Sequence, residues 1–164
     1  MVLFITAILL VVIVPSQKIF FDRAKAETLA AKLTQAIRLA RDESISSGFP
    51  AVLCKSADQK TCSGEWRDGY IILQNKKVAY VFRNNPAEGS LYWRSSLARD
   101  FLEFLPEGTT PNENGTFWYC AREAKNPAWA IVVSQSGRAR QVLPNSSGEI
   151  HDAAGRPLSC FRIN

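Results

Sequence analysis

The sequence lacks the residues and motifs on which the common enzyme mechanisms depend. It contains one histidine, His151, in 164 residues, so sites that need two histidines from one chain are excluded. It has no nucleophile elbow, no His-Glu-x-x-His, no phosphate-binding glycine loop and no dinucleotide fingerprint. The carboxylate pairs Asp42-Glu43 and Asp100/Glu103 are of a kind that helix and loop surfaces supply routinely. We therefore expect no enzyme and no cofactor.

The chain also lacks an apolar run of full membrane-spanning length. Met1–Val14 carries no charge and only one polar side chain, Thr6, whereas a spanning helix needs about 20 apolar residues. A signal-peptide core has this length, but the basic residue before it and the small-x-small site after it are missing. A buried core helix with no polar face is unusual in a small domain. We favour a membrane helix that is truncated at its start.

The helical pattern continues beyond Pro15, which is expected to kink the helix because proline removes one hydrogen bond. Charged residues fill one side of this amphipathic stretch, and Gly48 and Pro50 are typical of a helix end. The predicted rod, Met1–Ser47, is roughly 70 Å long. Its apolar residues recur at helical spacing: Ala26, Leu29, Ala30, Leu33, Ile37 and Ala40.

Short runs of β-branched and aromatic residues, separated by Gly, Asn, Asp and Pro, predict strands in the rest of the chain. Strands that follow a helix indicate an α+β domain, with the sheet packed on the apolar stripe of the helix. The predicted strands are Ala51–Lys55, Gly69–Gln74, Val78–Arg83, Leu91–Arg94, Phe101–Leu105, Thr116–Ala121, Ala128–Ser134, Arg138–Leu143 and Ser159–Ile163.

Four cysteines are present, and an even number in an exported chain favours disulfides. Cys54 and Cys62 flank a short loop, so a local bridge is the simplest pairing, and this leaves Cys120 with Cys160. Three connectivities are formally possible, and the sequence alone does not choose among them. A zinc site is the competing interpretation, but no Cys-x-x-Cys spacing is present and only one histidine is available. We expect no metal.

Taken in order, four segments give the chain a specific resemblance. They are the apolar helix ending in Val14-Pro15-Ser16, the helix end Leu33–Gly48, the residues after that helix, Pro50–Cys54 with Trp66–Ile72, and the segment Val132–Arg140. In this combination the chain resembles the FimT/GspH-type pseudopilins, which are minor pilins. The resemblance covers most of the chain and is weakest between about Val78 and Glu107.

The resemblance implies a type IV pilin fold, in which a long N-terminal helix packs on a C-terminal antiparallel β-domain. Residues 1–15 would be the transmembrane part, and residues 16–164 a periplasmic domain with its helix to about residue 47 and its β-domain over 50–164. Such a protein resides in the bacterial inner membrane and becomes surface-exposed in a pilus. Its partners are the inner membrane before assembly and other major and minor pilins in the filament.

Family members begin with a basic leader, a Gly-Phe cleavage junction and a glutamate a few residues into the mature helix. None of these precedes Val14, and Met1 falls where the family is already inside the membrane helix. We interpret this as a late start or a truncated chain. Prepilin peptidase is a partner if an upstream leader exists.

The charge is mildly basic, with 20 Lys and Arg, 15 Asp and Glu, a net charge of +5 and a pI near 9.2. Gly137-Arg138-Ala139-Arg140 follows a turn signal and opens a predicted strand. Residues two apart in a strand point to the same face, so Arg138 and Arg140 would stand roughly 6.6 Å apart. This separation is close to the phosphate spacing of one nucleic-acid strand, and guanidinium groups bind phosphate oxygens bidentately.

Other basic residues are expected near this pair. Arg156 and Arg162 lie in the tail that a Cys120–Cys160 bridge would hold nearby, and Lys125 lies in the preceding loop. In FimT-type pilins of naturally transformable bacteria, a Gly-Arg-x-Arg motif is associated with DNA capture, and Gly137–Arg140 has that pattern. The predicted DNA-binding set is therefore Gly137, Arg138, Arg140, Arg156, Arg162 and Lys125.

Two function classes stay open. The first is a minor pilin that binds DNA without sequence preference, through backbone phosphates, for uptake in natural transformation. The second is a structural pseudopilin of a type IV pilus or a type II secretion system without DNA binding. In that case the arginines are solvated, or they pair with Glu123, Glu149 and Asp152. An ordinary secreted adhesin would need a removable signal peptide, and we find none.

Overall fold

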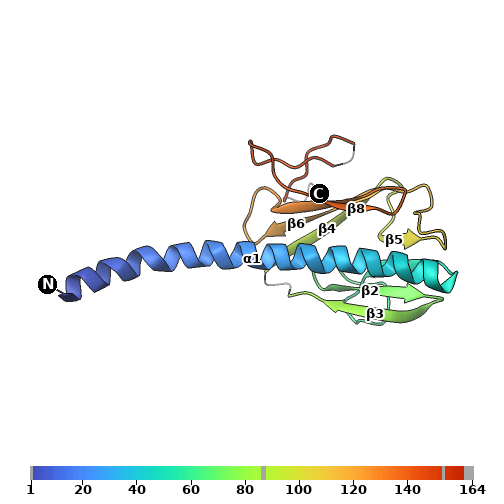
Figure 1. Ribbon diagram of the computed structural model, residues 1–164, viewed down its shortest axis with the longest axis horizontal. Coiled ribbons are helices and arrows are strands. Elements are labelled where there is room, and N and C mark those ends of the chain that lie inside the picture. The colour runs from blue at the N-terminus through green and yellow to red at the C-terminus, as the bar shows by residue number, and fades with distance from the viewer. Residues whose placement is uncertain (1, 86–87, 153, 161–164) are drawn as a thin grey trace.

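A computed structural model of the protein describes residues 2–85, 88–152 and 154–160, with side chains from Asp22 onward. A single long helix, α1 (Val2–Ser47), comprises 46 residues and runs through Pro15 without interruption. Gly48 ends it in the left-handed conformation, with φ 72°, and its N–H donates to the Ser44 carbonyl at 3.1 Å. Glycine after the last helical turn accepts this conformation without strain. In Figure 1 the N-terminal part of α1 projects beyond the strands.

The predicted apolar stripe is the face that α1 buries. Leu33 and Ile37 are almost completely buried, and the small residues Ala26, Ala30 and Ala40 let the strands approach the helix closely. Leu29 is partly buried against the same core. Among the residues described with side chains, no helical stretch has both the length and the apolar character that a membrane crossing needs.

The described β-domain forms two antiparallel sheets instead of one, and α1 lies across both. In Figure 1, β2 and β3 lie on one side of the helix, and β4, β6 and β8 lie on the other. The orders are β3-β2-β1-β5 and β4-β6-β7-β8. The strands are β1 (Ala51–Lys55), β2 (Gly69–Gln74), β3 (Lys77–Arg83), β4 (Gly89–Ser95), β5 (Phe101–Phe104), β6 (Gly115–Ala121), β7 (Trp129–Val133) and β8 (Ala139–Val142).

The first eight predicted strands are confirmed, with ends that shift by a residue or two. The ninth, Ser159–Ile163, is wrong where the structure describes it, because Ser159 and Cys160 lie in no strand. Their backbone groups bond elsewhere: the Cys160 N–H donates to the Lys125 carbonyl at 3.2 Å, and the Trp118 indole donates to the Ser159 carbonyl at 3.1 Å. Residues 161–163 lie outside the described residues.

The inner faces of both sheets meet the helix stripe in one core. Trp129 of β7 is 1% exposed, and its indole Nε1 donates to the Ala26 carbonyl of α1 at 2.7 Å. Phe117 of β6 meets Trp66 edge to face, with ring centroids 4.9 Å apart. The Trp129 hydrogen bond ties the second sheet to α1, and the Phe117–Trp66 contact ties it to the loop before β2. That sheet carries the site described below.

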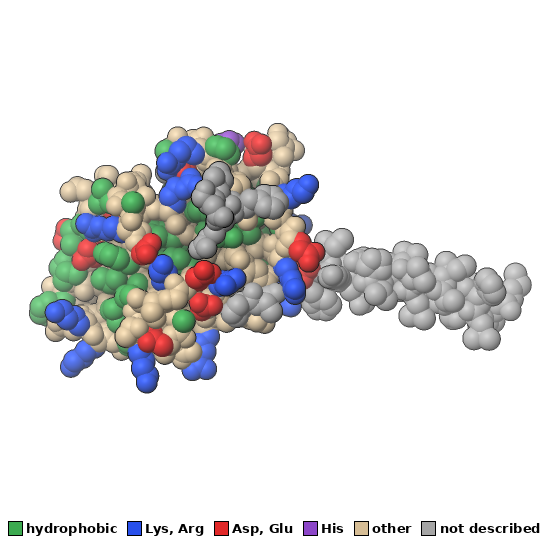
Figure 2. All heavy atoms as spheres, turned by 180° about the vertical axis from the view of Figure 1, so that it is seen from behind, with side chains coloured by type: hydrophobic (Ala, Val, Ile, Leu, Met, Phe, Trp, Pro, Cys, Tyr) green, Lys and Arg blue, Asp and Glu red, His purple; other side chains and the backbone are tan. Residues whose placement is uncertain are grey.

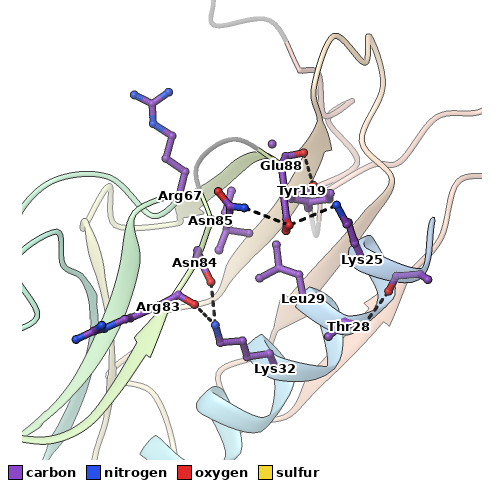
Figure 3. Close-up of a pocket in the computed structure, with 13 residues that line it drawn as sticks. Lys25, Thr28, Leu29, Lys32, Arg67, Arg83, Asn84, Asn85, Glu88 and Tyr119 are labelled. Carbon is purple, nitrogen blue, oxygen red and sulfur yellow. Dashed lines mark hydrogen bonds and ion pairs between the residues drawn. The ribbon is translucent and has the colours of Figure 1, made fainter. Parts of the chain in front are cut away.

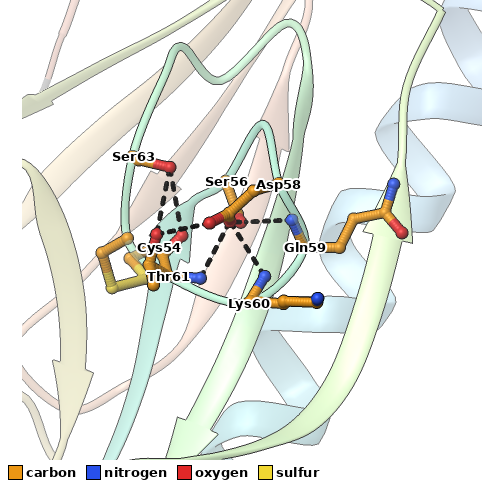
Figure 4. Close-up of a disulfide and its surroundings, with 8 residues drawn as sticks. Cys54, Ser56, Asp58, Gln59, Lys60, Thr61 and Ser63 are labelled. Carbon is orange, nitrogen blue, oxygen red and sulfur yellow. Dashed lines mark hydrogen bonds between the residues drawn. A yellow bond between two sulfur atoms is a disulfide. The ribbon is translucent and has the colours of Figure 1, made fainter.

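Both predicted disulfides are present, Cys54–Cys62 and Cys120–Cys160. Since these bonds use all four cysteines, the zinc interpretation has no thiolate ligands left. Figure 4 shows the small loop closed by the first bridge. There the Asp58 carboxylate accepts hydrogen bonds from the backbone N–H groups of Thr61 and Lys60, both at 2.9 Å. These bonds, the one from Thr61 first, hold the pKa of Asp58 well below its usual range.

Candidate nucleic-acid interface

The sheet β4-β6-β7-β8 has an inner face toward α1 and an outer face toward the C-terminal segment, described over residues 144–152 and 154–160. Strand residues alternate between the two faces. Phe117 and Ile131 point inward to the main core, whereas Trp118 and Ala130 point outward. Ile150 of the C-terminal segment packs over these outward side chains in a second, smaller core. The outer face is therefore partly covered by its own chain.

One cross-strand row on this outer face carries arginine at both ends, and its two middle residues, Thr116 and Val132, are buried. The strand register pairs Arg94 of β4 with Thr116, Thr116 with Val132, and Val132 with Arg140 of β8. With neighbouring strands about 4.8 Å apart, the backbones at the two ends of the row are roughly 14 Å apart. The sheet thus fixes the relative position of two arginines that are far apart in the sequence.

Arg138 and Arg140 are both exposed, as predicted, and they flank Ala139, which packs against the main core. This alternation places both arginines on the outer face. Arg138 Nε donates to the Ser136 hydroxyl at 3.4 Å. Among the described residues, no ion pair involves either arginine. Their guanidinium groups are thus available to an external anion.

Gly137 serves the fold of this hairpin. It is buried, has φ +76°, and its N–H donates to the Ser134 carbonyl at 2.9 Å. A Cβ here would lie 2.2 Å from the Gly108 carbonyl oxygen, which also accepts a hydrogen bond from Arg41 Nε at 2.9 Å. The missing side chain therefore lets the hairpin dock near the C-terminal end of α1. Gly137 positions the arginines and is itself shielded from large ligands.

Arg94 was not among the predicted site residues. The structure joins it to Arg156 through the buried carboxylate of Asp152, to which both arginines donate. The pairing with Asp152, which the sequence left open as an alternative, is therefore observed for Arg156. Burial alone would raise the pKa of Asp152, but hydrogen bonds from the Arg156 and Ala154 backbone and from the two arginine side chains outweigh it, and the pKa is lowered.

The remaining predicted residues lie elsewhere. Lys125 is exposed in the loop between β6 and β7, at the opposite end of these strands from Arg138. The hairpin that carries Arg138 lies against Arg41 of α1. The end of the strands that carries Lys125 lies near Ala26 of α1, because the Trp129 indole donates a hydrogen bond to the Ala26 carbonyl. Those two helix positions are roughly 22 Å apart along α1. The structure therefore does not bring Lys125 to the arginine pair, and Arg162 lies outside the described residues.

A hollow of about 440 Å³ lies between α1 and the region around Asn84 and Glu88. Figure 3 shows that lysines point into it, but they already have partners. Lys25 Nζ lies 3.5 Å from a Glu88 carboxylate oxygen. Lys32 donates to the Arg83 carbonyl and to Asn84, and burial lowers the Lys32 pKa. Because the Glu88 carboxylate also lines this hollow, it is a poorer phosphate site than the pair Arg138 and Arg140, which has no acidic partner among the described residues.

On the face drawn in Figure 2, Lys and Arg side chains are spread among Asp and Glu side chains, and some of them lie on the same side of the molecule as the histidine of the C-terminal segment. Comparison with known proteins shows to which family the chain belongs. Residues 29–137 match the family model described as type II transport protein GspH. The chain belongs to the GspH family. The matched span ends at Gly137, so the arginines at 138, 140 and 156 lie beyond it.

A solved pilin shares the fold. FimU, a type IV minor pilin of Pseudomonas aeruginosa, is 23% identical, with 87% of this chain and 99% of that chain covered and a TM-score of 0.57. A second crystal form of FimU gives a TM-score of 0.53, with 82% and 99% covered at 23% identity. The minor pseudopilin EpsH of Vibrio cholerae is 17% identical, with 74% and 98% covered and a TM-score of 0.48. No curated protein matches the chain.

The GspH-family chain is thus a FimT/GspH-type minor pilin or pseudopilin. Family and fold are those of structural pilin proteins. Membership implies a membrane-anchored subunit with a periplasmic domain that associates with other pilins in a filament.

Proposed function

We propose that this minor pilin binds DNA through the outer-face arginines and so helps a type IV pilus capture DNA for natural transformation. Contacts to backbone phosphates carry no sequence information, so the protein binds DNA of any sequence. The observation that carries the proposal is the pair Arg138 and Arg140: both are exposed, lie on one face, and have no acidic partner among the described residues. The resemblance of Gly137–Arg140 to the Gly-Arg-x-Arg pattern supports the same ligand.

The arginines define a small interface, so binding should be weak and dependent on salt. A patch with two to four phosphate contacts gives a slope of log affinity against log salt between about −1.8 and −3.6, with a dissociation constant in the micromolar range or weaker. Several copies along a filament, or several minor pilins on one DNA molecule, raise the overall affinity through multivalency.

The test uses the full chain in a non-ionic detergent and a fluorescent duplex, titrated by anisotropy at several salt concentrations. We expect the stated slope and equal affinity for the duplex and for a scrambled sequence of the same length. No binding at low salt, or an affinity that does not change with salt, would exclude phosphate recognition. Such a result would favour the alternative, a structural pseudopilin without DNA binding, which the family's type II transport description supports.

Retention in the inner membrane through residues 1–15, and cleavage of an upstream leader by prepilin peptidase, stay predictions. Both predictions concern the N-terminal end of the chain. The proposed DNA contacts do not depend on it, because every residue of the outer face lies after β3.

A further inference from the structure

We infer that Arg94 and Arg156 form a second binding site for a backbone phosphate of DNA, which we call the seat. Asp152, although acidic, strengthens DNA binding by holding both arginines in place. This inference rests on the proposed DNA-binding function. It adds Arg94, a strand residue far from the Gly-Arg-x-Arg pattern. It also gives a positioning role to the Asp152 carboxylate, whose negative charge by itself would weaken DNA binding.

Asp152 uses both of its oxygens. Oδ2 accepts from Arg94 Nη1 at 3.1 Å and from Arg156 Nε at 2.8 Å. Oδ1 accepts from the backbone N–H groups of Ala154 and Arg156, both at 2.9 Å. The Asp152 side chain is 4% exposed, whereas those of Arg94 and Arg156 are 37% and 61% exposed. The carboxylate is thus buried beneath two guanidinium groups that reach solvent.

Each arginine keeps free donors after it has bonded to Asp152. A guanidinium has five N–H donors, and the carboxylate engages one nitrogen of each. Two guanidinium groups and one carboxylate leave a net charge of +1 at this point. The remaining N–H groups can therefore serve a phosphate oxygen without breaking the bonds to Asp152.

Aromatic rings pack against the Arg94 side chain. Its guanidinium carbon lies 5.2 Å from the centre of the Trp118 ring, and Trp118 stacks on Tyr92 with ring centroids 5.3 Å apart. Trp118 is itself held by its hydrogen bond to the Ser159 carbonyl. A cation above an aromatic face is attracted to it, so Arg94 is held by the ring as well as by Asp152. An arginine fixed before binding loses less conformational entropy when it meets a phosphate.

A small hollow of about 60 Å³ lies beside these groups, lined by Arg94, Asp152 and Arg156 together with Thr116 and Asn114. Thr116 is the residue next to Arg94 in the cross-strand row that ends at Arg140. The seat and the Arg138/Arg140 pair therefore lie at the two ends of one row on one sheet face, with the buried residues Thr116 and Val132 between them. A DNA backbone that spans roughly 14 Å can contact both.

The decisive variant is Asp152→Asn, because charge and positioning predict opposite results. Removing a negative charge should strengthen DNA binding if only net charge matters. If Asp152 positions the arginines, the affinity should fall by about 3- to 10-fold, a loss of one or two oriented contacts. The matched control is Glu149→Gln, which removes the same charge from an exposed position of the same segment and should bind equally or slightly more tightly. If Asp152→Asn also binds more tightly, the inference is wrong.

A second variant guards against local unfolding of the C-terminal segment. Arg94→Gln leaves the Asp152–Arg156 pair in place and should reduce the magnitude of the salt slope by about 0.9. Arg94→Lys should restore the slope but only part of the affinity, because lysine keeps the charge and loses the planar fork. All variants are measured in the full chain in detergent by the same duplex titration.

The outcomes separate the two proposals. If Arg94→Gln binds with the parent's affinity and slope while the Arg138/Arg140 variants lose binding, the seat is wrong and the proposed function stands. If the parent chain itself does not bind DNA, the proposed function fails, and the seat fails with it.

Discussion

Replacing Arg138 and Arg140 together with glutamine is expected to weaken DNA binding by about 10- to 30-fold at low salt, which corresponds to roughly 1.4–2 kcal/mol. The salt slope should lose about 1.8 of its magnitude, because two phosphate contacts disappear. The fold should be unaffected, since both side chains are exposed and have no ion-pair partner among the described residues. Duplex titration and thermal unfolding of the same samples measure both effects.

Two controls separate contact from net charge. The double lysine variant of the same positions should retain part of the binding, because the charges remain while the bidentate fork is lost. Arg23→Gln with Arg38→Gln removes the same charge from exposed positions of α1 and should leave the affinity close to that of the parent. If both double glutamine variants bind alike, the effect is long-range charge, and Arg138 and Arg140 are not the contact site.

Replacing Cys120 and Cys160 together with serine is expected to lower the free energy of unfolding by about 3–4 kcal/mol in the chain-entropy model. The bridge spans 40 residues, and Cys120 lies in the small core where Leu158 packs near Trp118. Without the bridge, the C-terminal segment should separate more readily from the sheet and carry Arg156 away from Arg94. We therefore expect lower stability in urea and weaker DNA binding.

The matched control is the pair Cys54→Ser and Cys62→Ser, whose bridge spans 8 residues. A shorter closed loop stabilises less, about 2.6 kcal/mol in the same model, and this loop belongs to the other sheet. Its loss should lower stability without changing the affinity for DNA. An unchanged urea midpoint after loss of Cys120–Cys160 would show that the bridge does not hold the segment.

Local patterns in the sequence were sufficient for most of the fold. The helix stripe at Leu33 and Ile37 follows from a repeat of 3.6 residues, and the strand interiors follow from their β-branched and aromatic content. The strand predicted at Ser159 and Cys160 was wrong because an irregular segment can satisfy its backbone through a loop carbonyl and an indole, as these two residues do. The division into two sheets depends on long-range pairing that no local pattern encodes.

The site was only half predictable for the same reason. Arg138 and Arg140 are two residues apart, so strand alternation placed them together correctly. Arg94 joins the outer face only through the pairing of β4 with β6 and of β6 with β7, and nothing near it in the sequence indicates this. Lys125 shows the converse: it is closer to Arg138 in sequence, but the β6–β7–β8 connections place it at the other end of the strands.

The central claim is that DNA meets this minor pilin at the outer face of the β4-β6-β7-β8 sheet. The most direct test is to follow the Nε–H signals of the arginine side chains by NMR while a short duplex is added to the full chain in detergent micelles. We predict shifts at Arg138, Arg140, Arg94 and Arg156, with Arg23 and Arg38 of α1 unchanged. Shifts confined to the arginines of α1, or no shift at any arginine at duplex concentrations well above the micromolar range, would contradict it.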